Sequence, residues 1–323
     1  MSKTEYAIDT KETILLGGVS QSIRVRTADP ALPVLLFLHG GPGVCDRHWV
    51  LKYQSGLADA ATMVCWDQRG SGLSYDKKAG TSVMTVSRMV EDAAALAELL
   101  CARFGKDKLI VVGHSWGTLL GTLLAHRRPE HIAAYIGMGQ FVEGDRNEAM
   151  SYDFVLGVAR ERGDKKALED LARIGAPVKG HYRNLDDLMV QRNLMTKYGG
   201  GTYKGKESLM SSMVIPLLKS PEYKLADLKR YSDGAFSSLR ALWEEVVDFN
   251  LLEEIPALAM PVYLTEGRHD QNTPPAIAEA WFAALDAPKK EWIWFEESAH
   301  SPIKEEPALW GETVRRIVGE QSC

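Results

Sequence analysis

The segment Gly113-His114-Ser115-Trp116-Gly117 constrains the fold more than any other feature of this chain. It follows a short apolar run, residues 109–112, and precedes a stretch, residues 118–126, whose pattern predicts a helix. A Gly-x-Ser-x-Gly pattern between strand and helix is typical of a turn too sharp for side chains at the glycine positions, which leaves the serine hydroxyl exposed. The same five-residue pattern can also arise by chance in an ordinary turn, so the rest of the chain has to decide.

Short apolar runs that are too brief for buried helices recur along the chain and predict strands buried on both faces. They occupy residues 33–38, 63–66, 109–112, 135–138, 262–264 and 292–295. Helical patterns lie between several of them, most clearly over residues 86–100, where apolar positions keep a helical spacing. Two further short pieces, residues 14–16 and 23–25, flank Gly17-Gly18 and predict an amino-terminal hairpin. Strands alternating with helices predict an α/β fold with a mostly parallel central sheet and helices on both faces.

The alternation stops in the middle of the chain, where helical stretches such as residues 239–249 occur without comparable strand runs. Strand signals resume at Pro261, which argues against a separate contiguous domain. We therefore expect residues 1–141 to form the first part of a core, residues 142–252 an inserted helical cap, and residues 253–323 the second part of the core.

Composition limits the classes of partner. The 323 residues carry a net charge of −5, and their Lys and Arg residues are scattered among acids, so we expect no nucleic-acid partner. The amino terminus is polar and no apolar stretch approaches the about 18 residues that span a bilayer, which predicts a soluble cytoplasmic protein without a membrane partner. The cysteines stand far apart, at Cys45, Cys65, Cys101 and Cys323, so neither a zinc site nor a redox pair is indicated and no metal or cofactor is expected.

A serine in such a turn needs a base and an orienting acid, which follow it along the chain in the order serine, acid, histidine. Asp270 comes shortly after the strand pattern at residues 262–264, and His300 shortly after the one at residues 292–295. The sequence therefore predicts a catalytic triad of Ser115, Asp270 and His300.

Other acids and another histidine compete for these roles. His269 is adjacent to Asp270, and neighbouring residues do not readily present a base and its acid to each other, so we expect it to be a structural or rim residue. Glu266 lies close to the strand, and Glu296 and Glu297 lie very near His300 itself.

Acyl transfer also needs hydrogen-bond donors aimed at the developing oxyanion. The backbone N–H of Trp116, directly after the serine, is one candidate. The glycine-rich loop His39-Gly40-Gly41-Pro42-Gly43 lets backbone N–H groups approach a substrate, and Gly41 is our candidate for the second donor. A purely geometric turn is the alternative for Gly40 and Gly43.

Two further segments have alternative roles. For the segment Asp67-Gln68-Arg69-Gly70-Ser71-Gly72 we favour a structural role over a catalytic one, because its Asp and Arg can hydrogen-bond to loop backbones. Cys45, Asp46 and His48 either line the pocket entrance or simply begin a helix.

Taken together, these segments resemble the α/β-hydrolases and, within them, the proline iminopeptidases. The matching pieces are His39-Gly40-Gly41-Pro42-Gly43, Trp66-Asp67-Gln68-Arg69-Gly70-Ser71-Gly72, Gly113-His114-Ser115-Trp116-Gly117, Gly267-Arg268-His269-Asp270 and Ala299-His300-Ser301. The resemblance implies a metal-free serine hydrolase with a helical cap over Ser115, Asp270 and His300, which removes an amino-terminal residue, often proline, from a small peptide.

The sequence departs from that family at two positions. Relatives of this kind hold the substrate's ammonium group with carboxylates, and in some of them an acid directly follows the triad aspartate, where this chain has Gln271. His114 stands where many proline iminopeptidases have glycine, and it resembles the corresponding position in esterases.

Three glutamates of the cap could supply the missing charge. Glu244 and Glu245 lie beside Trp243 on a predicted helix, and Glu207 lies in a segment before it. The alternative for each is a solvated helix face.

Three functions remain open at this point. An aminopeptidase acting on small peptides or amides is the first, and a carboxylesterase, lactonase or amidase for a small hydrophobic acyl substrate is the second. The third is a ligand-binding signalling protein that keeps the hydrolase fold. The oligomeric state does not follow from the sequence.

Overall fold

The computed structural model describes residues 5–78, 84–203 and 215–321. Its strands form one 8-stranded sheet in the order β1-β2-β4-β3-β5-β6-β7-β8. The pairs from β4 to β8 are parallel, and β1 and β2 are antiparallel additions at one edge. The predicted mostly parallel sheet is confirmed. The strands are β1 (Ile8–Leu16), β2 (Val19–Thr27), β3 (Val34–Leu38), β4 (Thr62–Asp67), β5 (Leu109–His114), β6 (Ile132–Met138), β7 (Val262–Gly267) and β8 (Lys290–Phe295).

The amino-terminal hairpin is also confirmed, with longer strands than the sequence indicated. Leu16 pairs with Val19 around Gly17 and Gly18, whose φ angles of 53° and 80° suit a tight hairpin turn. β1 is exposed along much of its length, so polar residues occupy it and no long apolar run marks it.

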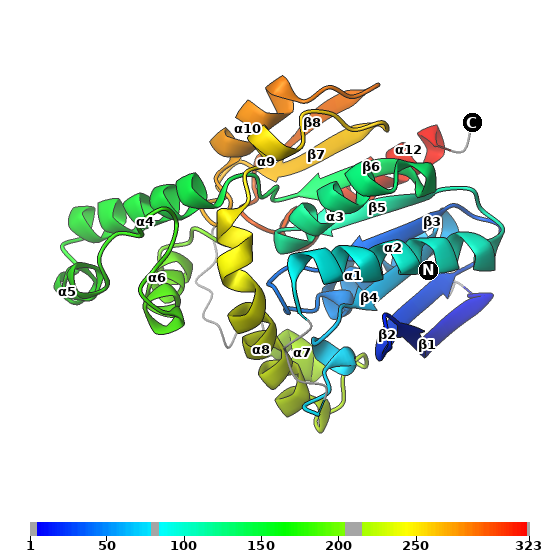
Figure 1. Cartoon of the computed structure of the whole chain (residues 1–323), viewed down its shortest axis with the longest axis horizontal. Helices are drawn as coiled ribbons and strands as arrows, with labels where there is room; N and C mark the ends of the chain where they lie inside the picture. The colour runs from blue at the N-terminus through cyan, green and yellow to red at the C-terminus, as the bar shows by residue number, and fades with distance from the viewer. Residues whose placement is uncertain (1–4, 79–83, 204–214, 322–323) are drawn as a thin grey trace.

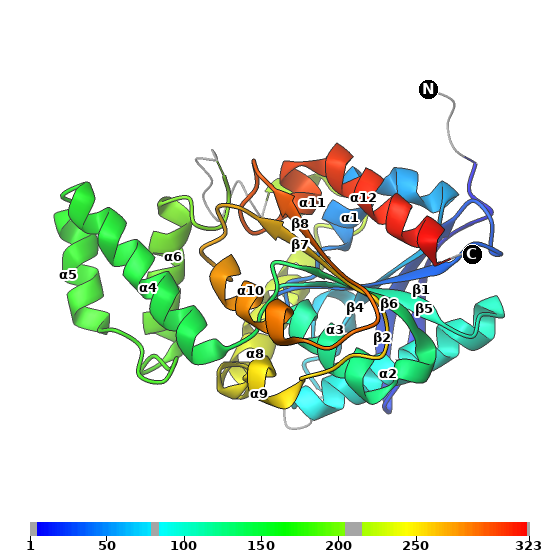
Figure 2. The same cartoon turned by 90° about the horizontal axis from the view of Figure 1, so that it is seen from above.

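Helices cover both faces of the sheet (Figure 2). On one face lie α1 (Arg47–Tyr53), α11 (Pro302–Glu305) and α12 (Pro307–Glu320). On the other lie α2 (Val86–Phe104), α3 (Trp116–Arg127) and α10 (Pro275–Ala284). The core consists of two apolar clusters, one against each face, because β3, β4 and β5 are buried on both sides. That burial explains why these strands read as continuous apolar runs.

The described helices and strands between β6 and β7 are all helices, in the block that the sequence predicts as a cap. They are α4 (Gly144–Glu161), α5 (Lys165–Ile174), α6 (Leu185–Lys197), α7 (Ile215–Lys219), α8 (Asp227–Asp248) and α9 (Leu251–Glu254). The two ends of the block lie side by side, since Leu251 N donates to Val142 O at 2.8 Å and Gly144 N donates to Phe249 O at 3.2 Å.

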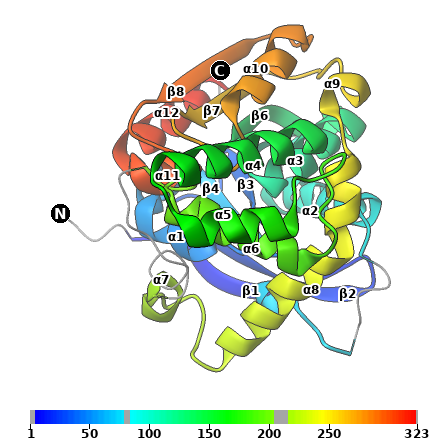
Figure 3. The same ribbon diagram turned by 90° about the vertical axis from the view of Figure 1, so that its left-hand side faces the viewer.

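The block projects beyond the carboxyl ends of the parallel strands (Figure 1). Seen from that end, α4, α5 and α6 lie in front of the sheet, with α8 beside them (Figure 3). Helices α4, α5, α6 and α8 share an apolar cluster of their own. The loops at the carboxyl ends of the strands therefore lie under these helices, which is where ligands bind in open α/β sheets.

In the part of the chain that the structure describes, no helix has both the length and the apolar character needed to cross a membrane.

Candidate active site

Ser115 occupies the turn between the end of β5 and the start of α3. Its backbone has φ 54° and ψ −121°, a conformation that non-glycine residues seldom adopt. The first turn of α3 lies so close to β3 that a side chain at Gly117 would collide with the carbonyl oxygen of Leu38. Such strain persists where the surrounding structure enforces it, and here it presents the Ser115 side chain at the end of the strand.

Asp270 and His300 meet across the ends of two strands. Asp270 follows β7, His300 follows β8, and His300 Nδ1 lies 2.7 Å from Asp270 Oδ2. Asp270 is fully buried and His300 is 9% exposed. The other carboxylate oxygen, Oδ1, accepts from the backbone N–H groups of Asn272 at 2.7 Å and Thr273 at 3.0 Å, so the carboxylate is held in a single orientation.

The end of β6 brings this pair to the serine. Ser115 N donates to Met138 O at 3.0 Å. At the next residue, Gly139, an added Cβ would lie 3.0 Å from His300 Nδ1 and 3.3 Å from Asp270 Oδ2. All three predicted triad residues therefore converge on one strand end. Gly139 has φ 59° and leaves room for the pair, a role that sequence reasoning missed although the residue directly follows a predicted strand.

The two candidate oxyanion donors flank Ser115. Trp116 is the first residue of α3, and the first N–H groups of a helix have no partner within it. The glycine-rich loop reaches the serine from β3, because an added Cβ on Gly40 would lie 3.3 Å from Ser115 Cβ. Gly41 is the residue after this contact, in the same loop.

His114 packs against His300 and contacts its backbone. Its ring centroid lies 5.0 Å from that of His300, and its Nε2 lies 3.0 Å from the His300 carbonyl oxygen, to which it donates. The histidine that departs from many proline iminopeptidases thus contacts the loop that carries His300 directly.

Glu305 holds the same loop from α11. Its carboxylate accepts from the backbone N–H groups on both sides of His300, Ala299 at 3.3 Å and Ser301 at 3.1 Å. It also accepts from Tyr203 N at 2.6 Å, which joins the histidine loop to the helical block. Burial raises the pKa of Glu305, although these hydrogen bonds oppose the rise. No motif marked this residue.

The competing base and acids have other partners. His269 stacks on Tyr203 with ring centroids 3.9 Å apart, and its Nε2 lies 3.2 Å from the Glu296 carbonyl oxygen. The Glu296 carboxylate pairs with Arg268 at 2.6 Å, and Glu297 N donates to Glu306 at 3.0 Å. None of these contacts involves Ser115, Asp270 or His300.

Glu266 is fully buried at the end of β7, and its Oε1 accepts from Gln140 N at 3.0 Å. Its Oε2 has no hydrogen-bond partner among the described residues. Burial raises the pKa of Glu266 well above its usual range, and the Gln140 hydrogen bond offsets only part of that rise. The negative charge of Asp270 adds to it.

This burial predicts a specific pH dependence of stability. Because the folded-state pKa exceeds the ordinary value of 4.5, the native state binds more protons than the unfolded state between the two values, and stability falls as pH rises across that window. A one-proton difference contributes about 1.4 kcal/mol per pH unit. Urea unfolding of Glu266→Gln from about pH 5 to pH 8 is expected to lack this contribution.

The matched control is Glu296→Gln, since Arg268 lowers the pKa of the exposed Glu296. It should leave the slope in that window as in the wild type. A Glu266→Gln protein that keeps the wild-type slope would contradict the expectation.

The cap glutamates suggested by the sequence are engaged elsewhere. Glu244 accepts from His181 Nδ1 at 2.7 Å with 70% of its side chain exposed, and Glu245 accepts from Val86 N at 2.8 Å at the start of α2. Among the described contacts, neither one touches the triad. Glu207 lies outside the described residues.

Gln271 does lie beside the triad acid. Its backbone N–H donates to Gly200 O at 2.8 Å, so this position contacts the turn that follows α6.

A buried carboxylate that sequence reasoning missed lies on α4. Glu148 is fully buried, and its Oε1 accepts from Arg192 Nη2 at 2.6 Å and from Asn147 Nδ2 at 3.1 Å. Asn147 Nδ2 also donates to the carbonyl oxygen of Asn272, two residues after Asp270, at 3.0 Å. Glu148 Oε2 has no hydrogen-bond partner among the described residues. Burial lowers the pKa of Arg192, but the attraction of Glu148 outweighs it and leaves that pKa raised.

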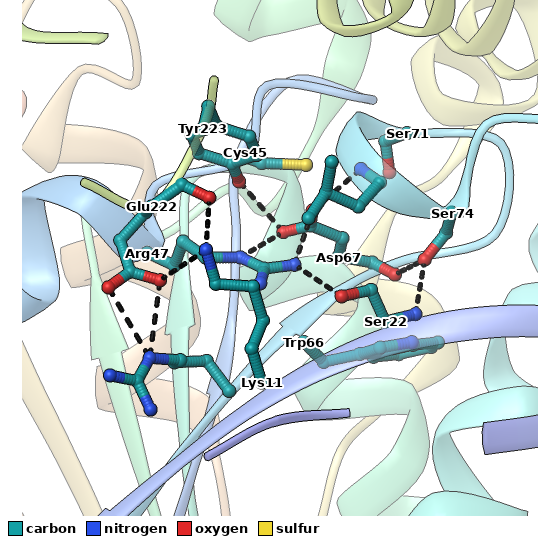
Figure 4. A network of polar contacts seen from close by, with 12 residues as sticks. Lys11, Ser22, Cys45, Arg47, Trp66, Asp67, Ser71, Ser74, Glu222 and Tyr223 are labelled. Carbon is teal, nitrogen blue, oxygen red and sulfur yellow. Dashed lines mark hydrogen bonds and ion pairs between the residues drawn. The ribbon is translucent and has the colours of Figure 1, made fainter. Parts of the chain in front are cut away.

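Asp67 anchors a buried polar network at the end of β4. Figure 4 shows Arg47 and Tyr223 pointing at the Asp67 carboxylate, which accepts from Arg47 Nε at 2.7 Å and from the Tyr223 hydroxyl at 2.9 Å. The neighbouring Glu222 pairs with Arg24 at 3.2 Å. Because Glu222 and Tyr223 precede α8, the network ties the helical block to the sheet.

The remaining residues after the glycine loop begin a helix. Asp46 immediately precedes α1, and Cys45 Sγ lies 3.6 Å from His39 Nε2. His48 is buried, and burial lowers its pKa to about 4. Over the residues that the structure describes, no group of three or more His, Cys, Asp or Glu side chains is arranged to hold a metal ion.

Comparison with known proteins identifies the family of this chain. The profile of the alpha/beta hydrolase fold matches residues 33–307. A Bacillus subtilis protein named probable aminopeptidase YbaC is 33% identical over 319 residues, covering 98% of each chain. A proline iminopeptidase of Heyndrickxia coagulans is 26% identical over 302 residues, covering 89% of each. The crystal structure of the Mycobacterium smegmatis proline iminopeptidase superposes with a TM-score of 0.65 at 19% identity, covering 97% of this chain and 98% of that one.

Proposed function

The chain belongs to the alpha/beta hydrolase fold family and is a serine hydrolase, and from that premise we propose that it is an aminopeptidase that releases the N-terminal residue from small peptides or amides, proline among them. In this proposal Ser115, His300 and Asp270 are the triad, and the N–H groups of Trp116 and Gly41 form the oxyanion hole.

The proposed reaction proceeds through an acyl-enzyme. His300 Nε2 takes the proton from the Ser115 hydroxyl while Oγ attacks the scissile carbonyl carbon, and Asp270 holds the imidazole through Nδ1. The two N–H groups stabilise the negative oxygen of the tetrahedral intermediate. The C–N bond then breaks, and His300 delivers its proton to the leaving amine. Water, deprotonated by His300, releases the N-terminal residue and restores Ser115.

One observation supports an amine substrate in particular. The buried carboxylate of Glu148 has an oxygen without a hydrogen-bond partner among the described residues, and Asn147 joins the carboxylate to the loop that follows Asp270. A substrate ammonium would supply the missing donor. We propose Glu148, rather than Glu244 or Glu245, as the carboxylate that recognises the free amino group.

Substrate choice gives the direct test. Proline p-nitroanilide, its N-acetyl form and p-nitrophenyl butyrate are compared with the wild type and with Ser115→Ala in one buffer. Because acetylation removes the positive charge of the substrate, we expect the wild type to hydrolyse the free-amine anilide and not the N-acetyl anilide.

A variant of the proposed subsite sharpens that test. Glu148→Gln is expected to lower kcat/KM for the free-amine anilide by about 10- to 100-fold, the cost of losing a hydrogen bond to a charged group. The matched control is Glu244→Gln, an exposed glutamate of the same helical block, which should behave as the wild type. Unfolding midpoints of both variants check that Arg192 still packs. Equal losses on ester and amine substrates would contradict a role in amine recognition.

The second candidate is a carboxylesterase, lactonase or amidase for a small hydrophobic acyl group. Two observations favour it. Gln271 beside Asp270 is neutral, and Glu244 and Glu245 bind His181 and the Val86 N–H instead of facing the triad residues. Turnover of p-nitrophenyl butyrate with none of the free-amine anilide would establish this candidate and reject the aminopeptidase.

A further inference from the structure

The peptide between Gly40 and Gly41 carries the second candidate oxyanion donor, and its other face is fixed by hydrogen bonds. The Gly40 carbonyl oxygen accepts from His39 Nδ1 at 2.8 Å and from Val44 N at 3.1 Å. In a trans peptide the N–H and C=O groups point in opposite directions, so holding the Gly40 oxygen also aims the Gly41 N–H.

The His39 ring can do this only in one tautomer. Nδ1 must carry the proton, since the Gly40 carbonyl can only accept, and Nε2 then accepts from Gln68 N at 3.2 Å. Burial lowers the pKa of His39, which favours the neutral ring that this arrangement needs.

The side chain of Gln68 connects this loop to the other donor. Its Nε2 donates to the His39 carbonyl oxygen at 3.0 Å, and its Oε1 accepts from the Trp116 indole N–H at 2.9 Å. Gln68 is fully buried. A single carboxamide therefore spans the two segments whose backbone N–H groups face the oxyanion, the glycine loop after β3 and the first residue of α3.

Gln68 is itself held on its own strand end. Its carbonyl oxygen accepts from the Ser71 hydroxyl at 2.6 Å, and the preceding residue, Asp67, is locked by Arg47 and Tyr223 (Figure 4). The carboxamide thus projects from a rigid support and can fix the separation of the segments that it joins.

We infer that Gln68 is a positioning residue for the reaction, whose side-chain amide sets the separation and direction of the Gly41 and Trp116 N–H groups. The inference rests on the proposed Ser115 mechanism. Oxyanion donors act at about 2.7–3.1 Å from the oxygen, and a displacement of about 1 Å can cost about 10²-fold in rate.

The test uses two pairs of variants that remove the same kind of bond. Gln68→Leu deletes both side-chain hydrogen bonds, and Trp116→Phe deletes only the indole bond. The controls are Gln21→Leu and Trp66→Phe, because the Trp66 indole donates to Gln21 Oε1 at the same 2.9 Å and Gln21 is equally buried. Among the described hydrogen bonds, no side-chain bond of either control residue reaches the glycine loop or Trp116.

The expected result is a loss of transition-state stabilisation with little loss of substrate binding. Gln68→Leu should lower kcat by about 10²-fold with little change in KM, and Trp116→Phe by a smaller factor, while the controls keep kcat near that of the wild type. Affinity for a boronic acid, which forms a tetrahedral adduct on Ser115, should fall in parallel with kcat/KM. If Gln68→Leu does not fold, Trp116→Phe against Trp66→Phe carries the same comparison.

Two outcomes separate this inference from the proposed function. Labelling of the wild type by a fluorophosphonate comes first, and absence of label at Ser115 would overturn the mechanism itself and the inference with it. A labelled wild type, with Gln68 and Trp116 variants that keep kcat and boronate affinity at the level of their controls, would overturn the positioning role alone.

Discussion

Replacing Ser115 by alanine is expected to lower kcat by about 10⁶-fold on every substrate that the protein turns over. The nucleophile is lost while its surroundings stay intact, because the strained turn is held by the Ser115 N to Met138 O hydrogen bond and by the packing of Gly117 on Leu38. The residual rate would come from the oxyanion donors and substrate binding alone. Initial rates of Ser115→Ala on the anilide and ester substrates measure the effect.

The control for this variant is chemical labelling. A fluorophosphonate should label the wild type and Ser301→Ala, a serine directly after His300, and should not label Ser115→Ala. Full turnover by Ser115→Ala, in a preparation free of contaminating hydrolase, would reject the serine mechanism.

Asp270→Asn is expected to lower kcat by about 10⁴-fold. In the wild type the carboxylate accepts from His300 Nδ1 at 2.7 Å and so keeps the proton on that nitrogen. An amide in its place can present its NH₂ group to Nδ1 and stabilise the opposite tautomer, which leaves Nε2 protonated and unable to take the serine proton. Pre-steady-state acylation by p-nitrophenyl butyrate or proline p-nitroanilide isolates this step.

Glu266→Gln is the matched comparison, since it makes the same chemical change in the competing acid. Glu266 accepts from Gln140 N, so its loss should cost far less activity than the loss of Asp270. A larger loss in Glu266→Gln than in Asp270→Asn would move the acid role to Glu266.

Sequence reasoning worked where a feature is local. Buried strands such as β3 and β5 appear as apolar runs because both of their faces are covered, and the helical spacing of residues 86–100 marks the buried face of α2. The resemblance to the alpha/beta hydrolases and proline iminopeptidases, inferred from five short motifs, is confirmed by the matched family and by relatives along nearly the full chain.

Sequence reasoning failed where a role depends on partners far along the chain. The local pattern around Trp243 could not predict that Glu244 binds His181 or that Glu245 accepts from the first N–H of α2. Those contacts join residues 63 and 159 positions apart. Glu305 reaches Tyr203 across 102 positions and Gln68 reaches Trp116 across 48, and no local pattern records either contact.

The sequence by itself determined the order of strands and helices, the sharp turn at Ser115 and the fold family, because these depend on the spacing of apolar residues and glycines along a short stretch of chain. The sequence also named Asp270 as the partner of His300, but the tertiary structure alone decided that Gln68 joins the glycine loop to Trp116 and that Glu148 is the cap carboxylate buried beside the loop after Asp270. Hydrogen bonds act over about 3 Å, so these choices depend on which loops the sheet brings together.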